Sequence, residues 1–168
     1  MTVQIREATD EDWPAIWPFF HEIVVARETY TYDPHLTEDA ARELWMSPSS
    51  SPLRRTTVAV DADGTVLGSA NMYPNRPGPG AHVSSGSFMV DARARGKGVG
   101  RLLCADMIEW STRSGFRLIQ FNAVVETNKS AVHLWQALGF RIAGTVPGAF
   151  DHPTLGYVGL HVMYRPLP

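Results

Sequence analysis

The chain has 168 residues and a formal net charge of −2, with 15 Lys and Arg against 17 Asp and Glu, which suits one domain with a substantial core over residues 1–168. A near-neutral chain without a basic run argues against nucleic acid as a partner, and no apolar run approaches the ~18 residues of a membrane span. The single cysteine, Cys104, has no partner for an internal disulfide, which favours the reducing cytoplasm.

Hydrophobic patterning predicts a chain that mixes strands and helices. Acidic residues followed by apolar positions at helical spacing mark the first helix. The pair Asp63-Gly64 between two apolar runs is a strong hairpin signal. In chain order we expect a strand at 3–5, a helix opening at 10–12, a helix over 37–45, a polar turn over 47–52, strands over 57–60 and 66–70, a Pro/Gly loop over 74–79, a strand over 82–90, a helix from 99, a strand over 118–125, a helix over 130–138, and strands over 140–146 and 157–164.

The stretch Arg95-Gly96-Lys97-Gly98-Val99-Gly100 lies between a strand that ends at Val90 and the start of a helix. Its alternating glycines remove side chains where a backbone has to come close to another group. The first turn of the helix points free N–H groups at the same place, and Arg95, Lys97 and Arg101 add positive charge. Together these features predict an anion site, most often for phosphate.

Three kinds of phosphate site compete to explain this loop, beside a plain strand-to-helix turn with no ligand. A P-loop fails, because Lys97 is followed by Gly98 where a Ser or Thr has to reach Mg²⁺. A dinucleotide site fits poorly, because the spacing is G-x-G-x-G and the loop lies beyond the middle of the chain. The third pattern, R-x-x-G-x-G, is filled by Arg95, Gly98 and Gly100.

A second motif lies downstream of the loop. The run Asn128-Lys129-Ser130-Ala131-Val132-His133-Leu134-Trp135 is followed by Leu138-Gly139-Phe140. The two motifs together resemble the signature of the GNAT superfamily of acetyl-CoA-dependent N-acetyltransferases, R-x-x-G-x-G with N-x-x-A-x-x-L-Y…G-F, over essentially the whole chain. The resemblance implies an α/β (α+β) GNAT fold, a mixed and mostly antiparallel sheet of about seven strands with helices on both faces.

The resemblance also implies which residues hold acetyl-CoA, with no metal. The amides from Gly96 to Arg101 bind the pyrophosphate. Backbone groups at 88–90 bind the pantetheine arm where two strands splay, and a bulge at Gly86 would free those groups. Asn128 bonds the pantetheine amides, and Trp135 lies near the CoA sulfur. The cofactor-binding candidates are thus Phe88, Met89, Val90, Arg95, Gly96, Lys97, Gly98, Val99, Gly100, Arg101, Asn128 and Trp135.

Spacing alone gives several of these residues a structural role instead. Phe88 to Val90 fits an ordinary core strand, with Phe88 and Val90 on one face and Met89 on the other. Asn128 suits a helix cap, and Trp135 follows the core spacing of an amphipathic helix. Many relatives carry Tyr where Trp135 stands. An indole N–H is no acid at neutral pH, but a thiol of pKa ~8.5 leaves with little help, so we assign no general acid.

The general base is left open. Many relatives carry Glu on the strand before the glycine loop, but this strand reads Ser84-Ser85-Gly86-Ser87. Glu126, His82, Asp91 and Glu28 remain candidates, directly or through a water, each with a plain surface role as the alternative. Deprotonating a lysine-type amine of pKa ~10.4 costs ~4–5 kcal/mol at pH 7, and an α-amino group near ~8 costs far less. The missing base therefore favours an acceptor amine of low pKa.

The run from Phe121 to Asn128 resembles the F-N-x-V-x-E-T-N segment of GNAT members that act on small amino acids and their analogues, including fungal proline-analogue acetyltransferases. Asn122 and Phe88 match acceptor-site residues there, and Ser85 replaces a second Asn. Asn122 lies on an otherwise apolar strand, where a buried amide needs partners. The catalytic candidates are Asn122, Glu126 and Ser85. The acceptor candidates are Tyr30, Tyr32, Ser85, Phe88, Asn122 and Phe150, of which Tyr30 and Phe150 could instead be loop residues over the core.

The acceptor loops are aromatic and hydroxylic, whereas a polycation acceptor needs an acidic pocket. We therefore predict acetyl transfer from acetyl-CoA to the amine of a small molecule, an amino acid or an analogue, by direct attack in a ternary complex. The alternatives are a protein N-terminal or lysine acetyltransferase, which needs an open groove, and a non-catalytic acyl-CoA sensor. Relatives suggest a homodimer through the late strands.

Overall fold

The computed structural model describes residues 2–46 and 53–168, so the polar turn predicted over 47–52 lies outside the described residues. Its frame is a seven-stranded sheet in the order β1-β2-β3-β4-β5-β7-β6. All neighbouring strands are antiparallel except β4 and β5, which confirms the mixed, mostly antiparallel sheet. The strands are β1 (Gln4–Glu7), β2 (Arg55–Val60), β3 (Val66–Pro74), β4 (Val83–Val90), β5 (Leu118–Val125), β6 (Arg141–His152) and β7 (Gly156–Pro166).

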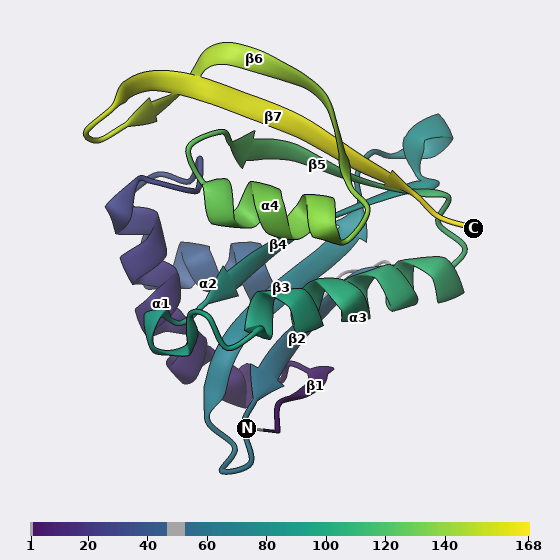
Figure 1. The fold of residues 1–168 in the computed structure, drawn as a ribbon. Helices are drawn as coiled ribbons and strands as arrows, with labels where there is room; N and C mark the ends of the chain where they lie inside the picture. Colours follow the sequence, from purple (N-terminus) through teal and green to yellow (C-terminus); the bar gives the residue numbers. More distant parts are fainter. Residues whose placement is uncertain (1, 47–52) are drawn as a thin grey trace.

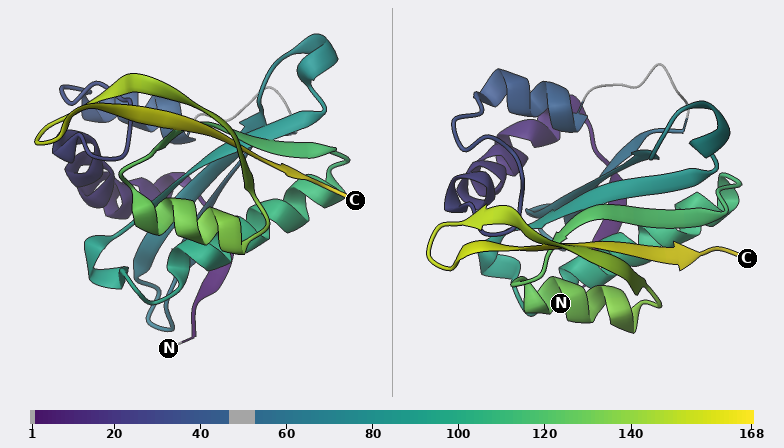
Figure 2. Two further views of the ribbon diagram at one scale, coloured as in Figure 1. Left: turned by 45° about the horizontal axis from the view of Figure 1, so that its top comes forward. Right: turned by 90° about the horizontal axis from the view of Figure 1, so that it is seen from above.

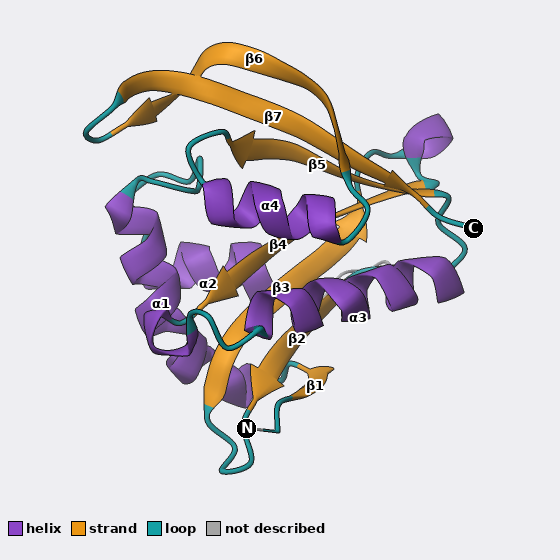
Figure 3. Cartoon of the chain, in the orientation of Figure 1, coloured by secondary structure: helices purple, strands orange, loops and turns teal. Residues whose placement is uncertain are grey.

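Helices cover both faces of the sheet, as Figures 1 and 2 show. One face carries α1 (Trp13–Ala26) and α2 (Glu38–Met46), and the other carries α3 (Val99–Arg113) and α4 (Lys129–Ala137). Figure 3 shows the same arrangement coloured by secondary structure. Most of these bounds agree with the predicted ranges to within a few residues.

Strand alternation builds the two halves of the core. Val58 and Val60 face α1 and α2, whereas Ala59 between them faces α3. The same alternation on β4 sends Met89 towards α1 and Phe88 towards α4, which confirms their predicted opposite faces. A buried hydrogen bond connects α2 to the sheet: Trp45 Nε1 donates to Ser69 Oγ at 2.9 Å.

The strands β4 and β5 pair only where they begin, at Val83 with Leu118 and Ser84 with Ile119. Beyond that point they diverge and open a V in the sheet. The bulge predicted at Gly86 is wrong, since β4 pairs with β3 in unbroken register. A Cβ at Gly86 would lie 2.7 Å from Asn71 O and 3.0 Å from Met107 Sδ, so the glycine serves close packing and the divergence itself frees the edge of β4.

The last two strands are longer than predicted. Register shifts between Ile142 and Gly144, and between Val146 and Phe150, let β6 continue past its predicted end at Val146. The β6–β7 hairpin therefore reaches past the end of β5 towards α1, as Figure 1 shows. An ion pair of 2.8 Å between Arg27 and Asp151 joins the hairpin to the chain after α1.

Candidate functional site

A cavity of about 1090 Å³ lies where β4 and β5 diverge. The ends of both strands, the first turns of α3 and α4, and the loop after α1 form its walls. Most residues singled out from the sequence line it: Tyr30, Tyr32, Ser85, Phe88, Met89, Val90, Arg95, Gly96, Gly98, Val99, Gly100, Arg101, Asn122, Asn128 and Trp135. Lys97, Glu126 and Phe150 do not. We call this space the splay cavity.

The glycine loop forms one end of the splay cavity. Gly98 caps α3 with a left-handed backbone, φ +79°, which a side chain adopts only with strain. Arg95 and Arg101 line the same end, so donors and positive charge converge there.

The hydroxyl of Tyr30 occupies the free edge of β4. It donates to Phe88 O at 2.6 Å and accepts from Phe88 N at 2.9 Å. These are the backbone groups that a neighbouring strand would take if β5 stayed paired with β4. Burial raises the pKa of the Tyr30 hydroxyl well above its usual value of 10.0, so the group keeps its proton at neutral pH.

An aromatic cluster forms the wall behind that edge. Phe88 lies 5.0 Å from Trp135 and 5.7 Å from Phe121, measured between ring centroids. Trp135 is only 8% exposed, so it is a core residue as its spacing indicates, and it also lines the splay cavity. Its ring gives the cavity an apolar surface without an acidic proton.

Asn128 caps α4, which is one of the two roles predicted for it. Its Oδ1 caps α4 by accepting from Ala131 N at 3.3 Å and from Ser130 Oγ at 3.1 Å. In the part of the chain that the structure describes, no group takes the hydrogens of Nδ2. Because Asn128 lines the splay cavity, that amide can donate to a ligand while the cap stays in place.

Asn122 differs from the expected buried amide. It lies at the register shift of β5, where its side chain is exposed at the cavity rim. Its Nδ2 donates to Asn75 Oδ1 at 2.6 Å and its Oδ1 accepts from Gln120 Nε2 at 2.9 Å. Its amide is thus already partnered by two neighbouring amides.

Three predicted residues lie elsewhere. The carboxylate of Glu126 accepts from Gly159 N, which fastens the end of β5 to β7. Phe150 is buried within the β6–β7 hairpin opposite Val158. Lys97 is exposed on the glycine loop outside the cavity lining.

The remaining acid–base candidates separate by position. Glu28 is the one carboxylate among the described residues that line the splay cavity. Asp91 is held by Arg93, whose hydrogen bonds keep the pKa of that carboxyl below its usual value, and His82 bonds Pro79 O outside the cavity. His152 also lines the cavity, and its Nδ1 accepts from Thr154 N and Leu155 N, so that nitrogen is already partnered.

Sequence reasoning missed several lining residues. Ser87 bonds Tyr32, and Tyr73 lies opposite Ser85 across β3 and β4. Strand alternation contained the signal, because Ser85 and Ser87 share a face and their partners on β3 share it with them. Thr127 also lines the cavity, with a buried hydroxyl that has no partner within the described residues.

Within residues 2–46 and 53–168, no helix is long and apolar enough to cross a membrane, and no three metal-ligating side chains form a cluster.

Comparison with known proteins agrees with this geometry. A model of the Acetyltransferase (GNAT) family matches residues 4–140. The L-methionine sulfoximine/L-methionine sulfone acetyltransferase of Pseudomonas aeruginosa is 30% identical over 88% of this chain and 85% of its own. N-acetyltransferase aca1 of Schizosaccharomyces pombe is also 30% identical, over 73% of this chain, and the match spans 64% of its length.

Solved structures give the same result. A GCN5-related N-acetyltransferase from Kribbella flavida has a TM-score of 0.95 and 74% identity, covering 98% of each chain. A phosphinothricin acetyltransferase from Sinorhizobium meliloti, determined with acetyl-CoA, has a TM-score of 0.85 and 27% identity over 99% of this chain and 89% of that one. With a family model that covers most of its length, this chain belongs to the GNAT acetyltransferase family.

Proposed function

We propose that residues 1–168 form one N-acetyltransferase domain that transfers an acetyl group from acetyl-CoA to the amine of an amino acid or amino-acid analogue. One observation carries the proposal: the diverging edge of β4 adjoins the N-terminus of α3 in one cavity. An extended thioester ligand needs backbone partners at its arm and an anion site at its pyrophosphate, and this cavity offers both. The small-molecule acceptor is supported by the Pseudomonas and Sinorhizobium relatives, whose names state such substrates.

In this proposal the first-turn amides of α3, with Arg95 and Arg101, hold the pyrophosphate. Asn128 Nδ2 and the free edge of β4 hold the pantetheine arm. When bound, acetyl-CoA supplies the thioester that the acceptor amine attacks. The thioester carbonyl oxygen replaces the Tyr30 hydroxyl as the acceptor of the Phe88 N–H. This hydrogen bond stabilises the negative charge that develops on the carbonyl oxygen.

The groups that line the splay cavity indicate where the proton of the acceptor amine goes. The amine loses one proton as its nitrogen forms the bond to carbon and the carbon–sulfur bond breaks. We assign that proton to Glu28, through a water, because it is the one described carboxylate in the cavity lining. The thiolate leaves without a dedicated acid, since its pKa of ~8.5 makes it a fair leaving group.

We also propose a homodimer formed through β6 and β7, and the cytoplasm as the compartment. The dimer is supported by the exposed apolar side chains of the hairpin. The compartment is supported by the single cysteine, Cys104, which is a free thiol and has no partner for an internal disulfide.

Thiol release from acetyl-CoA tests the function. The acceptor panel holds free amino acids, L-methionine sulfone, phosphinothricin, polyamines, aminoglycosides and peptides. We expect turnover with the amino acids or their analogues. Turnover with peptides alone would favour a protein acetyltransferase, and saturable acetyl-CoA binding without thiol release against every amine would favour a sensor. The Glu28→Gln variant is expected to lower kcat, because no carboxylate among the described lining residues is then left to take the proton that the amine loses.

A further inference from the structure

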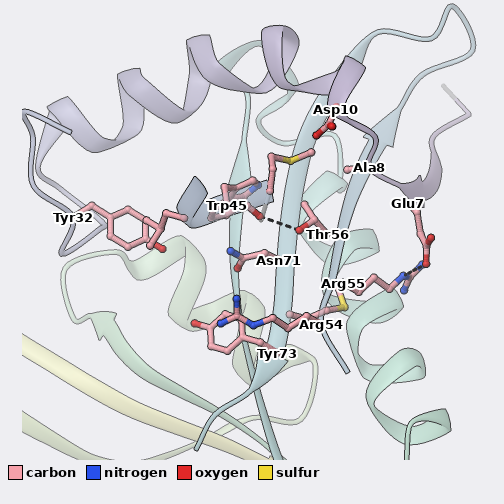
Figure 4. Close-up of a pocket in the computed structure, with 13 residues that line it drawn as sticks. Glu7, Ala8, Asp10, Tyr32, Trp45, Arg54, Arg55, Thr56, Asn71 and Tyr73 are labelled. Atoms are coloured by element: carbon pink, nitrogen blue, oxygen red, sulfur yellow. Dashed lines mark hydrogen bonds and ion pairs between the residues drawn. The ribbon is translucent and has the colours of Figure 1, made fainter. Parts of the chain in front are cut away.

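A second cavity, of about 660 Å³, borders the splay cavity and is shown in Figure 4. Tyr32 and Tyr73 line both cavities. The strand register pairs Asn71 with Thr56 on one side and Ser87 on the other. Directly paired residues share a face, so a polar row crosses β2, β3 and β4 on the face of α1 and α2.

Arg54 borders this second cavity with an available charge. Its guanidinium carbon lies 5.4 Å from the centre of the Tyr73 ring. No carboxylate within the described ranges pairs with it, whereas the neighbouring Arg55 pairs with Asp106 at 2.8 Å. A guanidinium held against a ring keeps its N–H groups free for a planar anion.

The acidic residues at the far end of the cavity do not cancel that charge. Glu7 lies 3.5 Å from Arg55, and Asp10 lies 3.1 Å from Arg42, measured between nitrogen and oxygen. Each carboxylate thus already pairs with an arginine, and Glu7 shares Arg55 with Asp106. Among the described residues that line this cavity, Arg54 is the cation without a carboxylate partner.

Asn71 provides a second, independent sign of a ligand. Its side chain is buried, with 8% exposure, and its Oδ1 has no hydrogen-bond partner in the described part of the chain. Figure 4 shows it between the Trp45–Thr56 pair and Tyr73, at the wall of the cavity. A buried amide oxygen without a donor is unfavourable, so a bound molecule that brings an N–H or O–H group gains from this position.

We propose that the second cavity receives the carboxylate of the acceptor, that Arg54 binds this carboxylate, and that Asn71 Oδ1 accepts from a donor group of the same molecule. The assignment rests on the proposed function, because the acceptor amine has to reach Phe88. The register pairs Asn71 with Ser87, the residue before Phe88, and Tyr73 with Ser85, three residues before it. An acceptor whose amine lies at Phe88 therefore meets Asn71 across one strand spacing of about 4.8 Å, and the long Arg54 side chain has to reach towards it from Tyr73. Because Arg54 binds the carboxylate in this assignment, the acceptor class is amines that carry a carboxylate.

A matched pair of ligands tests the assignment: L-methionine sulfone, and 3-(methylsulfonyl)propylamine, which lacks only the carboxylate. Binding of each is measured to protein saturated with CoA, and thiol release is measured with acetyl-CoA. We expect wild type to prefer the sulfone. Arg54→Met should weaken sulfone binding about ten- to a hundredfold and leave the amine unchanged, because it removes one charge-assisted bond. Acetyl-CoA affinity should not change.

Arg76→Met is the control, since Arg76 is an exposed arginine on the neighbouring loop that donates to Asn75 O. Equal binding of the two ligands by wild type would overturn the proposal, as would a preference that survives in Arg54→Met or is lost in Arg76→Met. Arg54-dependent sulfone binding without any thiol release would support the carboxylate site while contradicting acetyl transfer. Melting temperatures of both variants exclude a folding defect.

Discussion

The hydroxyl of Tyr30 and the proposed thioester compete for one backbone position. The hydroxyl satisfies both Phe88 N and Phe88 O, so a carbonyl oxygen at Phe88 N–H has to displace it. Tyr30 also stacks on Tyr32 at 5.3 Å between centroids, which places the ring at the boundary between donor and acceptor. One hydroxyl therefore sets part of the free energy of cofactor binding.

We expect Tyr30→Phe to bind acetyl-CoA more tightly, by about two- to tenfold, because one competing hydrogen bond is worth about 0.5–1.5 kcal/mol. Titration of the protein with acetyl-CoA measures the change. Tyr32→Phe is the control, because that hydroxyl bonds Ser87 instead. Weaker binding in Tyr30→Phe would mean that the hydroxyl stays and donates to the ligand.

At the scale of elements, the glycine loop and α3 form one functional unit. Gly98 is the N-cap of α3. A Cβ at this position would have no other atom within 4 Å, so the missing side chain leaves open space beside the helix. The cost of a side chain there is thus backbone strain and lost access for a ligand, without a clash inside the protein. Those two effects can be separated by comparison with another glycine.

We expect Gly98→Ala to lose about 1 kcal/mol of unfolding free energy and to weaken acetyl-CoA binding at least tenfold. Gly64 has nearly the same φ, +82°, and equally open surroundings in the β2–β3 hairpin. Gly64→Ala should lose similar stability and keep full acetyl-CoA affinity. Urea unfolding and ligand titration measure the two quantities, and equal affinities for both variants would contradict the pyrophosphate site.

The elements that were predicted well are those with strong local patterns. The helix from Val99 and the strand from Leu118 to Val125 begin at the expected residues, because amphipathic spacing and a continuous apolar run mark them. The β6–β7 hairpin was underestimated because bulges admit Gly144 and Pro147 into a strand. The free edge of β4 was attributed to a bulge, because the divergence of two strands depends on non-local packing. Arg54 and Asn71 were missed because they lie far apart in the sequence and only the fold places both on the lining of one cavity.

At the scale of the whole molecule, β6 is the uncovered edge of the sheet. It is twelve residues long, and its neighbourhood exposes Val146 at 56%, Leu155 at 61% and Tyr157 at 79%. A long, uncovered edge strand with apolar side chains invites pairing with another chain. When two copies of this chain are related by a two-fold axis, the β6 edge of each copy can cover the β6 edge of the other.

We expect light scattering to give a mass near twice 18.6 kDa for wild type. Val146→Lys places a charge on the edge strand and should shift the protein to a single copy. Leu44→Lys is the matched control, because Leu44 is an exposed apolar residue on α2, away from the hairpin. A wild-type mass of one copy at micromolar concentration would contradict the dimer. A monomeric Val146→Lys that keeps its acetyl-CoA affinity would show that the donor site is complete within one chain, as the lining of the splay cavity by a single protomer requires.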